Sequence, residues 1–156
     1  MGSFTKFTYH IIFGTKYRKP IISADISADI SERLYEYMGG TIRSLDGHLI
    51  EVGGIEDHIH LLANLPAKSA ISDSIGQIKS ASSKWMSDHA VNGFEWQKGY
   101  SAFTVSYSQI EHVARYIQNQ REHHRRQTFQ EEYVAFLQRH DIEYDPRYLF
   151  EAENHR

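Results

Sequence analysis

The segment from His58 to Leu65 constrains the fold of this chain more than any other stretch, because its side chains separate into two sets at a period of two. Successive side chains of a β-strand point to opposite faces of the sheet. One face of this predicted strand is aliphatic and carries Ile59, Leu61, Ala63 and Leu65. The other face carries His58, His60, Leu62 and Asn64. The strand therefore needs an apolar layer against its first face, and it places two imidazoles together on its second.

Two histidines at positions i and i+2 of a rigid strand can bind one divalent ion. A tetrahedral zinc site would need a third or fourth ligand, and the sequence contains no cysteine to provide it. Taken alone, His58 and His60 are more readily explained as ordinary strand histidines. Another element has to supply the rest of a metal site.

Residues 110–124 are the second informative stretch, and they predict an amphipathic helix. Apolar residues at spacings of three and four form one stripe, which consists of Ile110, Val113, Ala114 and Ile117. Ser108 followed by Glu111 matches a capping box and predicts where the helix starts. The opposite face carries His112, Tyr116, Asn119 and His123, with Gln120 at its flank.

A tyrosine kept for packing should lie in the apolar stripe, whereas Tyr116 lies among polar side chains. Gln120 follows one turn later and can reach the same small volume. The two residues are therefore candidates for a polar site. The alternative is a half-exposed surface tyrosine beside a solvated glutamine.

Strand and helix patterns follow one another in a defined order along the chain. Aromatic and β-branched residues predict strands at 4–16, in two runs within 48–65, and at 100–107. Apolar spacings predict helices at 22–45, 71–86, 110–124 and 129–137. The first six elements match the β-α-β-β-α-β order of ferredoxin-like α+β folds. We expect a single domain over residues 1–156, with an antiparallel sheet, helices on one of its faces, and C-terminal helices that carry Tyr116.

In such a fold the histidine face would point away from the packed helices and line an open sheet surface that a long polymer can reach. The helix of Tyr116 would come to that surface from the same chain or from another. Gly53 and Gly54 predict a kink or bulge in the preceding strand. A C-terminal tail is expected from about residue 146, after Asp145-Pro146.

The composition excludes several classes of protein. An apolar content of 40% and an aromatic content of 13% are typical of a folded chain. The sequence has no apolar run of about 18 residues and no secretory leader, so we expect a cytoplasmic protein with no membrane partner. The formal net charge of -3 argues against a broadly basic nucleic-acid binder and leaves room for local basic patches.

Two basic residues are candidates for phosphate contacts. Arg18 lies in the basic loop 17–20, and Lys79 lies off the apolar face of its predicted helix. The alternatives are a solvated turn for Arg18 and a solvated side chain for Lys79.

Three motifs occur in order on these predicted elements. They are DHIHLL at 57–62, WQKGY at 96–100 leading into SAFTVSYS, and YIQNQ at 116–120 leading into REHHRRQTFQEEY. Together they resemble the HUH-type single-tyrosine transposases of bacterial insertion sequences, which move as single-stranded DNA. The resemblance extends over nearly the whole chain.

This resemblance implies a set of functional residues. His58, His60 and Gln120 would hold a divalent cation, Mg²⁺ or Mn²⁺, and Tyr116 would attack the scissile phosphorus. The product would be a 5′-phosphotyrosine link and a free 3′-hydroxyl, so rejoining would need no nucleotide cofactor. The resemblance also implies single-stranded DNA with hairpins as partner, a homodimer whose active sites can be shared between subunits, and a bacterial or archaeal cytoplasm.

Two other functions stay open from the sequence. A domesticated relative could bind single-stranded DNA hairpins without cutting them. A metal-dependent hydrolase could use His58 and His60 with water as its nucleophile. The presence of His58, His60, Tyr116 and Gln120 together favours the transposase, because a protein that only binds DNA does not need all four.

Overall fold

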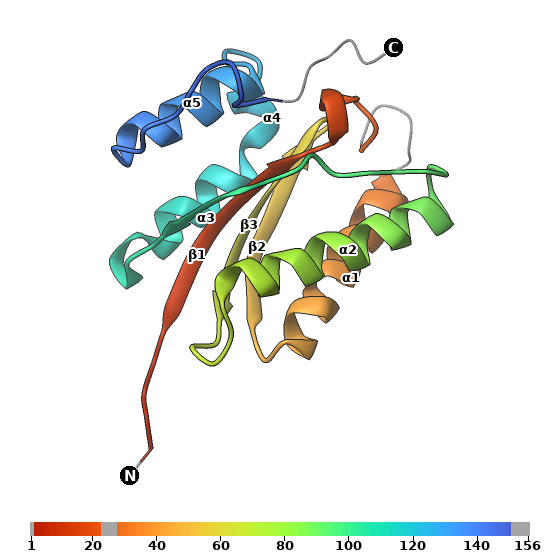
Figure 1. The fold of residues 1–156 in the computed structure, drawn as a ribbon. Coiled ribbons are helices and arrows are strands. Elements are labelled where there is room, and N and C mark those ends of the chain that lie inside the picture. Colours follow the sequence, from red (N-terminus) through yellow and green to blue (C-terminus); the bar gives the residue numbers. More distant parts are fainter. Residues whose placement is uncertain (1, 23–27, 151–156) are drawn as a thin grey trace.

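The computed structural model describes residues 2–22 and 28–150. Its elements, shown in Figure 1, are β1 (Phe7–Gly14), the 3-10 helix η1 (Lys16–Arg18), α1 (Ala28–Ser44), β2 (His48–Ile55), β3 (His58–Leu65), α2 (Ile71–His89), β4 (Ser101–Thr104), the 3-10 helix η2 (Tyr107–Gln109), α3 (Ile110–Gln118), α4 (Gln120–His123) and α5 (Phe129–Arg139). Residues 23–27 of the predicted helix 22–45 and residues 151–156 of the predicted tail lie outside the described residues.

The four strands form one sheet in the order β2-β3-β1-β4, and each neighbouring pair is antiparallel. β3 and β1 occupy the centre, where Ile12 pairs with His60 and Gly14 pairs with His58. The prediction of an α+β fold built on an antiparallel sheet is confirmed. Within the described residues, no helix is long and apolar enough to cross a membrane.

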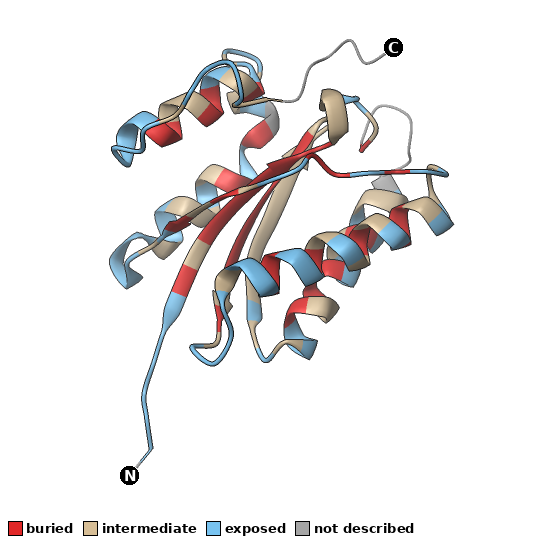
Figure 2. Cartoon of the chain, viewed as in Figure 1, coloured by how far each residue is buried: buried red, intermediate tan, exposed pale blue. Residues whose placement is uncertain are grey.

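Two apolar clusters lie on opposite faces of this sheet, and Figure 2 shows buried segments, in red, on the helices on both sides of it. The larger one joins α1 and α2 to the sheet and contains Ile59, Leu61, Ala63 and Leu65. The smaller one lies between the other face and α5, and contains Ile12, Phe103, Phe129 and Phe136. The predicted division of the β3 side chains between two faces is therefore confirmed.

The expectation of an open histidine surface is wrong. His58 and His60 are both 0% exposed, because α3, α4 and α5 cover that face of the sheet (Figure 1). The smaller apolar cluster supplies the reason: α5 carries its own row of aromatic residues, and these have to be buried against something. The C-terminal helices α3, α4 and α5 thus enclose His58 and His60, whereas the sequence predicted only that the helix of Tyr116 would approach an open surface.

Two local predictions are also wrong. The register shift in β2 lies between Leu49 and Glu51, while Gly53 pairs in register with His60. Gly53 instead allows close approach of α3, because a Cβ atom there would lie 2.6 Å from the Ile117 carbonyl oxygen. No capping box forms at Ser108, since η2 leads directly into α3.

The capping box of the C-terminal region lies at the start of α5. The Thr128 hydroxyl accepts a hydrogen bond from the Glu131 backbone N–H, and the Glu131 side chain accepts from the Thr128 backbone. The predicted tail packs back onto this helix as far as it is described, since the Phe150 ring lies 5.5 Å from that of Tyr133. The start of α5, which carries Glu132 in its first turn, is therefore well fixed.

Candidate metal centre and nucleophile

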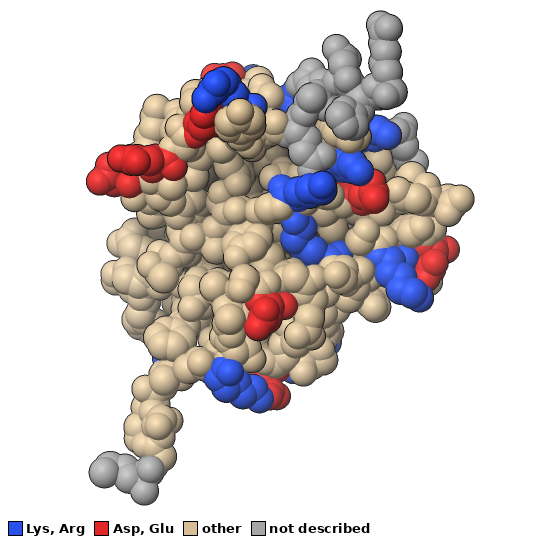
Figure 3. Space-filling model, viewed as in Figure 1, with Lys and Arg blue, Asp and Glu red and all other residues tan. Residues whose placement is uncertain are grey.

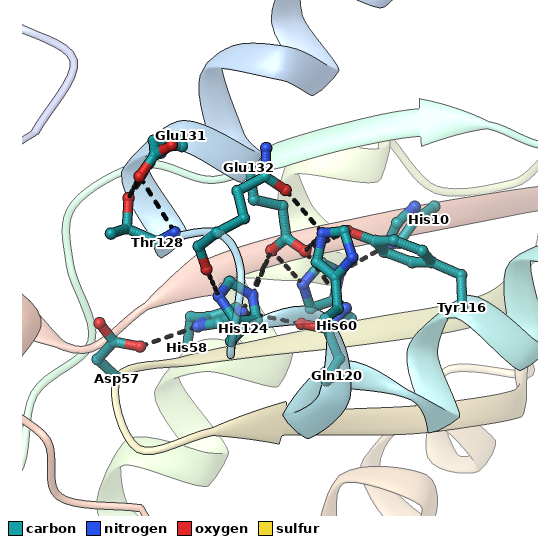
Figure 4. A network of polar contacts seen from close by, with 12 residues as sticks. His10, Asp57, His58, His60, Tyr116, Gln120, His124, Thr128, Glu131 and Glu132 are labelled. Carbon is teal, nitrogen blue, oxygen red and sulfur yellow. Dashed lines mark hydrogen bonds and ion pairs between the residues drawn. The ribbon is translucent and has the colours of Figure 1, made fainter.

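β3 directs His58 and His60 into one buried volume. His58 Nδ1 lies 2.9 Å from Asp57 Oδ1, and His60 Nδ1 lies 2.8 Å from Nε2 of His10 on β1. With the Nδ1 atoms engaged in this way, the Nε2 atoms of both rings face the same carboxylate, that of Glu132 (Figure 4).

Glu132 of α5 is the centre of the arrangement and is 1% exposed. Its Oε1 atom lies 2.9 Å from His60 Nε2, 3.1 Å from His124 Nε2 and 3.3 Å from His58 Nε2. Burial opposes ionisation of this carboxyl, but the imidazoles of His124, His58 and His60 outweigh burial and hold its pKa far below the ordinary value. The group is therefore a carboxylate surrounded by nitrogen donors.

The two strand histidines carry different charges. Burial lowers the pKa of His60 to about 4, in spite of its contact with Glu132. Burial also acts against the charged form of His58, but hydrogen bonds to Asp57 and Glu132 prevail and raise its pKa to about 9. At neutral pH and without a bound ion, His58 is therefore an imidazolium beside the Glu132 carboxylate, and His60 is neutral.

Tyr116 reaches this site from α3 of the same chain. Its ring is half-buried and lies 5.8 Å from the His60 ring and 5.7 Å from the Phe136 ring. Its hydroxyl donates a hydrogen bond to Glu132 Oε2. Burial and the nearby charge of Glu132 raise the pKa of Tyr116 well above its ordinary value, so the resting side chain is a phenol.

Gln120 joins the same cluster after an interruption of the helix. The predicted helix 110–124 is broken at Asn119, which has φ −96° and ψ 21° and separates α3 from α4. Gln120 is 1% exposed, and its Oε1 lies 3.1 Å from His58 Nε2. Its Nε2 donates to Glu132 Oε2 at 3.3 Å. The four residues predicted as a site thus lie together in one chain.

Sequence reasoning missed the participation of Glu132, His124 and His10. A signal for Glu132 was present, because it follows Phe129 by three positions and precedes Phe136 by four, and so lies on the apolar stripe of α5. A carboxylate on an apolar stripe is rarely buried unless it has partners. No comparable pattern singles out His124.

An open groove of about 890 Å³ lies beside the outer edge of Tyr116. Polar and basic side chains line it, among them His112, Arg115, Asn119, His123 and Arg126. Glu122 and Glu131 also line it, so its charge is mixed. Tyr116 is itself among the lining residues, so the groove reaches the tyrosine.

The two predicted phosphate contacts lie outside this cluster. Arg18 belongs to η1, which follows β1 at the sheet end where Gly14 pairs with His58. Figure 3 shows several Lys and Arg side chains on the viewed face of the molecule, near the place where η1 lies in Figure 1. Lys79 Nζ donates to the carbonyl oxygens of Gln97 and Gly99, both at 2.7 Å, and so ties α2 to the segment before β4.

Known proteins are similar to this chain in sequence and in fold. Residues 3–120 match the family model described as "Transposase IS200 like". The ISDra2 transposase TnpA of Deinococcus radiodurans is 26% identical over 120 residues, which cover 72% of this chain and 82% of that protein.

Two solved structures share the fold. A crystal structure of a candidate transposase from Deinococcus radiodurans R1 has a TM-score of 0.60 at 24% identity, covering 77% of this chain and 95% of that one. A REP-associated tyrosine transposase bound to a REP hairpin has a TM-score of 0.54 at 13% identity, covering 76% of this chain and 72% of that one. Since the family model spans most of the chain, the protein belongs to the IS200-like transposase family.

Proposed function

We propose that this protein cleaves and rejoins single-stranded DNA at hairpin-marked ends, through a 5′-phosphotyrosine intermediate and with a divalent metal ion. The observation that carries the proposal is the convergence of the Tyr116 hydroxyl, two imidazole Nε2 atoms and the Gln120 amide around one buried volume. The family membership adds the reaction class, DNA transposition.

The residues present fit a divalent ion. His58 and His60 are buried, directed at the same volume, and oriented through their Nδ1 atoms, as is usual for metal-ligating histidines. Gln120 adds an amide oxygen beside them. A bound ion would act as a Lewis acid that stabilises charge on the scissile phosphate.

Tyr116 supplies the nucleophile in this proposal. Its oxygen forms a bond to phosphorus, the bond from phosphorus to the 3′ oxygen breaks, and that oxygen leaves as a 3′-hydroxyl after taking up a proton. Glu132 Oε2, which already accepts the hydrogen bond of the phenol, takes up its proton only as the bond to phosphorus forms and charge leaves the phenol oxygen. Reversal of the same steps with another 3′-hydroxyl rejoins the strand without an added energy source.

The groove beside Tyr116 is the proposed path of the single strand. Arg115 and Arg126 line it and can contact the DNA backbone, while His112 and His123 offer ring faces on which bases can stack. Because nucleophile and histidines come from the same chain, each subunit of the expected homodimer would hold a complete site. Arg18 and Lys79 remain proposed contacts outside the groove.

The test is incubation of the purified protein with labelled single-stranded hairpin DNA from the flanks of its own gene, with Mn²⁺ or Mg²⁺, followed by a denaturing gel. The wild type should give a slow, protease-sensitive protein–DNA band. Tyr116→Phe and His60→Ala should give none. Tyr107→Phe is the matched control, because Tyr107 is 78% exposed and should be dispensable.

Three other outcomes would replace this proposal. Cleavage that persists in Tyr116→Phe would identify a hydrolase with water as nucleophile. Tight hairpin binding without cleavage in any lane would identify a binding protein. A protein–DNA adduct that forms equally well in the presence of EDTA would show that cleavage needs no metal ion.

A further inference from the structure

Four potential metal ligands meet at this site, and the sequence alone predicted no role for two of them, His124 and Glu132. One nitrogen each of His58, His60 and His124 and one oxygen of Glu132 all lie within 4.8 Å of one another. We propose that His124 and Glu132 are metal ligands, so that the centre is a three-histidine, one-carboxylate site. This inference rests on the proposed function and specifies its metal site more closely.

The orientation of the three imidazoles is the first support. Histidine ligands usually donate their second ring N–H to a carboxylate, a carbonyl or another acceptor, and this fixes the lone pair that binds the metal. His58 Nδ1 has the Asp57 carboxylate at 2.9 Å, and His60 Nδ1 has the His10 ring at 2.8 Å. His124 Nδ1 has the Gln127 carbonyl oxygen at 2.7 Å, and a carbonyl can only accept. All three Nε2 atoms then face Glu132 Oε1.

The burial of His124 is the second support. Its side chain is 4% exposed, and its Nε2 atom is buried without a hydrogen bond of acceptable geometry, although Glu132 Oε1 lies 3.1 Å away. A buried nitrogen in this condition is costly unless something binds to it. The neighbouring His123 differs, because its ring is 34% exposed, its Nε2 lies 2.7 Å from Gln127 Oε1, and it approaches only the other Glu132 oxygen, Oε2, at 3.5 Å.

The spacing of the donors is the third support. Ligand atoms at about 2.1 Å from a first-row ion in tetrahedral geometry lie roughly 3.4 Å apart. The three distances from Glu132 Oε1 to the imidazole nitrogens are 2.9, 3.1 and 3.3 Å. A small outward shift of the carboxylate would therefore accommodate an ion. Its second oxygen would remain directed at the Tyr116 hydroxyl.

This ligand set selects the chemical class of the ion. Imidazole suits first-row transition metals, whereas Mg²⁺ prefers oxygen ligands and retains several waters. Three nitrogens and one carboxylate therefore favour Mn²⁺, Co²⁺ or Zn²⁺ over Mg²⁺. Gln120 would stay beside the centre and donate its amide N–H to Glu132 Oε2.

The decisive experiment is X-ray absorption spectroscopy of the full-length protein loaded with Co²⁺, with no DNA present. Three imidazoles should contribute to the outer-shell scattering in the wild type and two in His124→Ala. Calorimetric titration with Mn²⁺ should show affinity losses of at least about 100-fold for His124→Ala and Glu132→Gln, more than the loss of an outer-shell partner causes. Mg²⁺ should bind far more weakly than Mn²⁺ to the wild type.

Glu131→Gln is the matched control for Glu132→Gln and should bind Mn²⁺ like the wild type, and His123→Ala, whose ring lies 3.5 Å from Glu132 Oε2, should lose less affinity than His124→Ala. Two imidazoles in the wild-type spectrum, or unchanged Mn²⁺ affinity in both ligand variants, would overturn the inference. The spectrum of the wild type decides the matter even if a variant fails to fold. Cleavage through Tyr116 in the same preparation would show that the proposed function survives such a result.

Discussion

The close contact between Gly53 and Ile117 makes the position of Tyr116, the proposed nucleophile, depend on the absence of a Cβ atom at residue 53. In Gly53→Ala the new Cβ would lie 2.6 Å from the Ile117 carbonyl oxygen and 3.1 Å from its Cγ2 atom. Ordinary contact begins at 3.4 Å, so α3 has to move away from β2 by about 0.8 Å. Ile117 directly follows Tyr116, and the hydroxyl will move with it.

A misplacement of roughly 1 Å at a reacting group can cost about 100-fold in rate. We therefore expect DNA cleavage by Gly53→Ala to fall by about that factor. Overpacking of this kind also lowers the free energy of unfolding, by about 1–3 kcal/mol. Mn²⁺ binding should largely persist, because none of the ligand side chains belongs to α3.

Single-turnover formation of the protein–DNA adduct is the appropriate assay, since it isolates the chemical step. Gly76→Ala is the matched control: nothing lies within 4 Å of its new Cβ, and its place inside α2 should make it about 1 kcal/mol more stable. Wild-type adduct formation and an unchanged melting temperature in Gly53→Ala would refute the close docking of α3 and the position of Tyr116 derived from it.

Three further predictions concern the same site. Because Tyr116 and the histidines meet within one chain, a mixture of Tyr116→Phe and His60→Ala proteins should form no protein–DNA adduct. If the sites were instead shared between the subunits of a dimer, the mixture would restore about a quarter of the wild-type amount. Glu132→Gln removes the proton acceptor and should slow adduct formation at saturating Mn²⁺ by at least about 100-fold, with DNA binding in a gel shift unchanged; an unchanged rate would exclude that role. The metal-free protein should have its highest melting temperature near pH 6.5. The raised pKa of His58, about 9, means that its contribution to stability is lost as the pH rises toward 9. The lowered pKa of His60, about 4, means that the folded state loses stability as the pH falls toward 4. Calorimetry from pH 4 to pH 9 that shows a steady trend in one direction would contradict these assignments.

Periodicity was sufficient to predict the parts of the site that depend on one element at a time. The alternation in β3 depends on the period of two alone, so it placed both imidazoles on one face correctly. The convergence of Tyr116 with these histidines could not be deduced from spacing, because it depends on how α3 packs against β2. The resemblance to a transposase family supplied that expectation, and the fold brings the residues together.

Other features depend on contacts between elements that are distant in sequence. The break at Asn119 turns Gln120 toward His58, and a helical repeat cannot anticipate such a turn. The enclosure of the histidines depends on where α5 packs, which the aromatic residues of α5 and β4 decide jointly. Sequence patterns predict that an apolar stripe will be buried, but they do not say against which surface.

The proposed metal site gives the region after the family match a role in the chemistry, through His124 and Glu132. The matched segment ends at residue 120, before either of these residues. Their side chains nevertheless occupy the centre of the site, and Glu132 lies in the first turn of α5, whose aromatic face covers the sheet. An ion that binds Glu132 and the strand histidines would bridge α5 and β3, and a ligand that binds only the folded state stabilises it. If His124 and Glu132 bind the ion as proposed, metal binding would stabilise the packing of α5 over the sheet, and loss of the ion should loosen the same helix that places the carboxylate beside Tyr116.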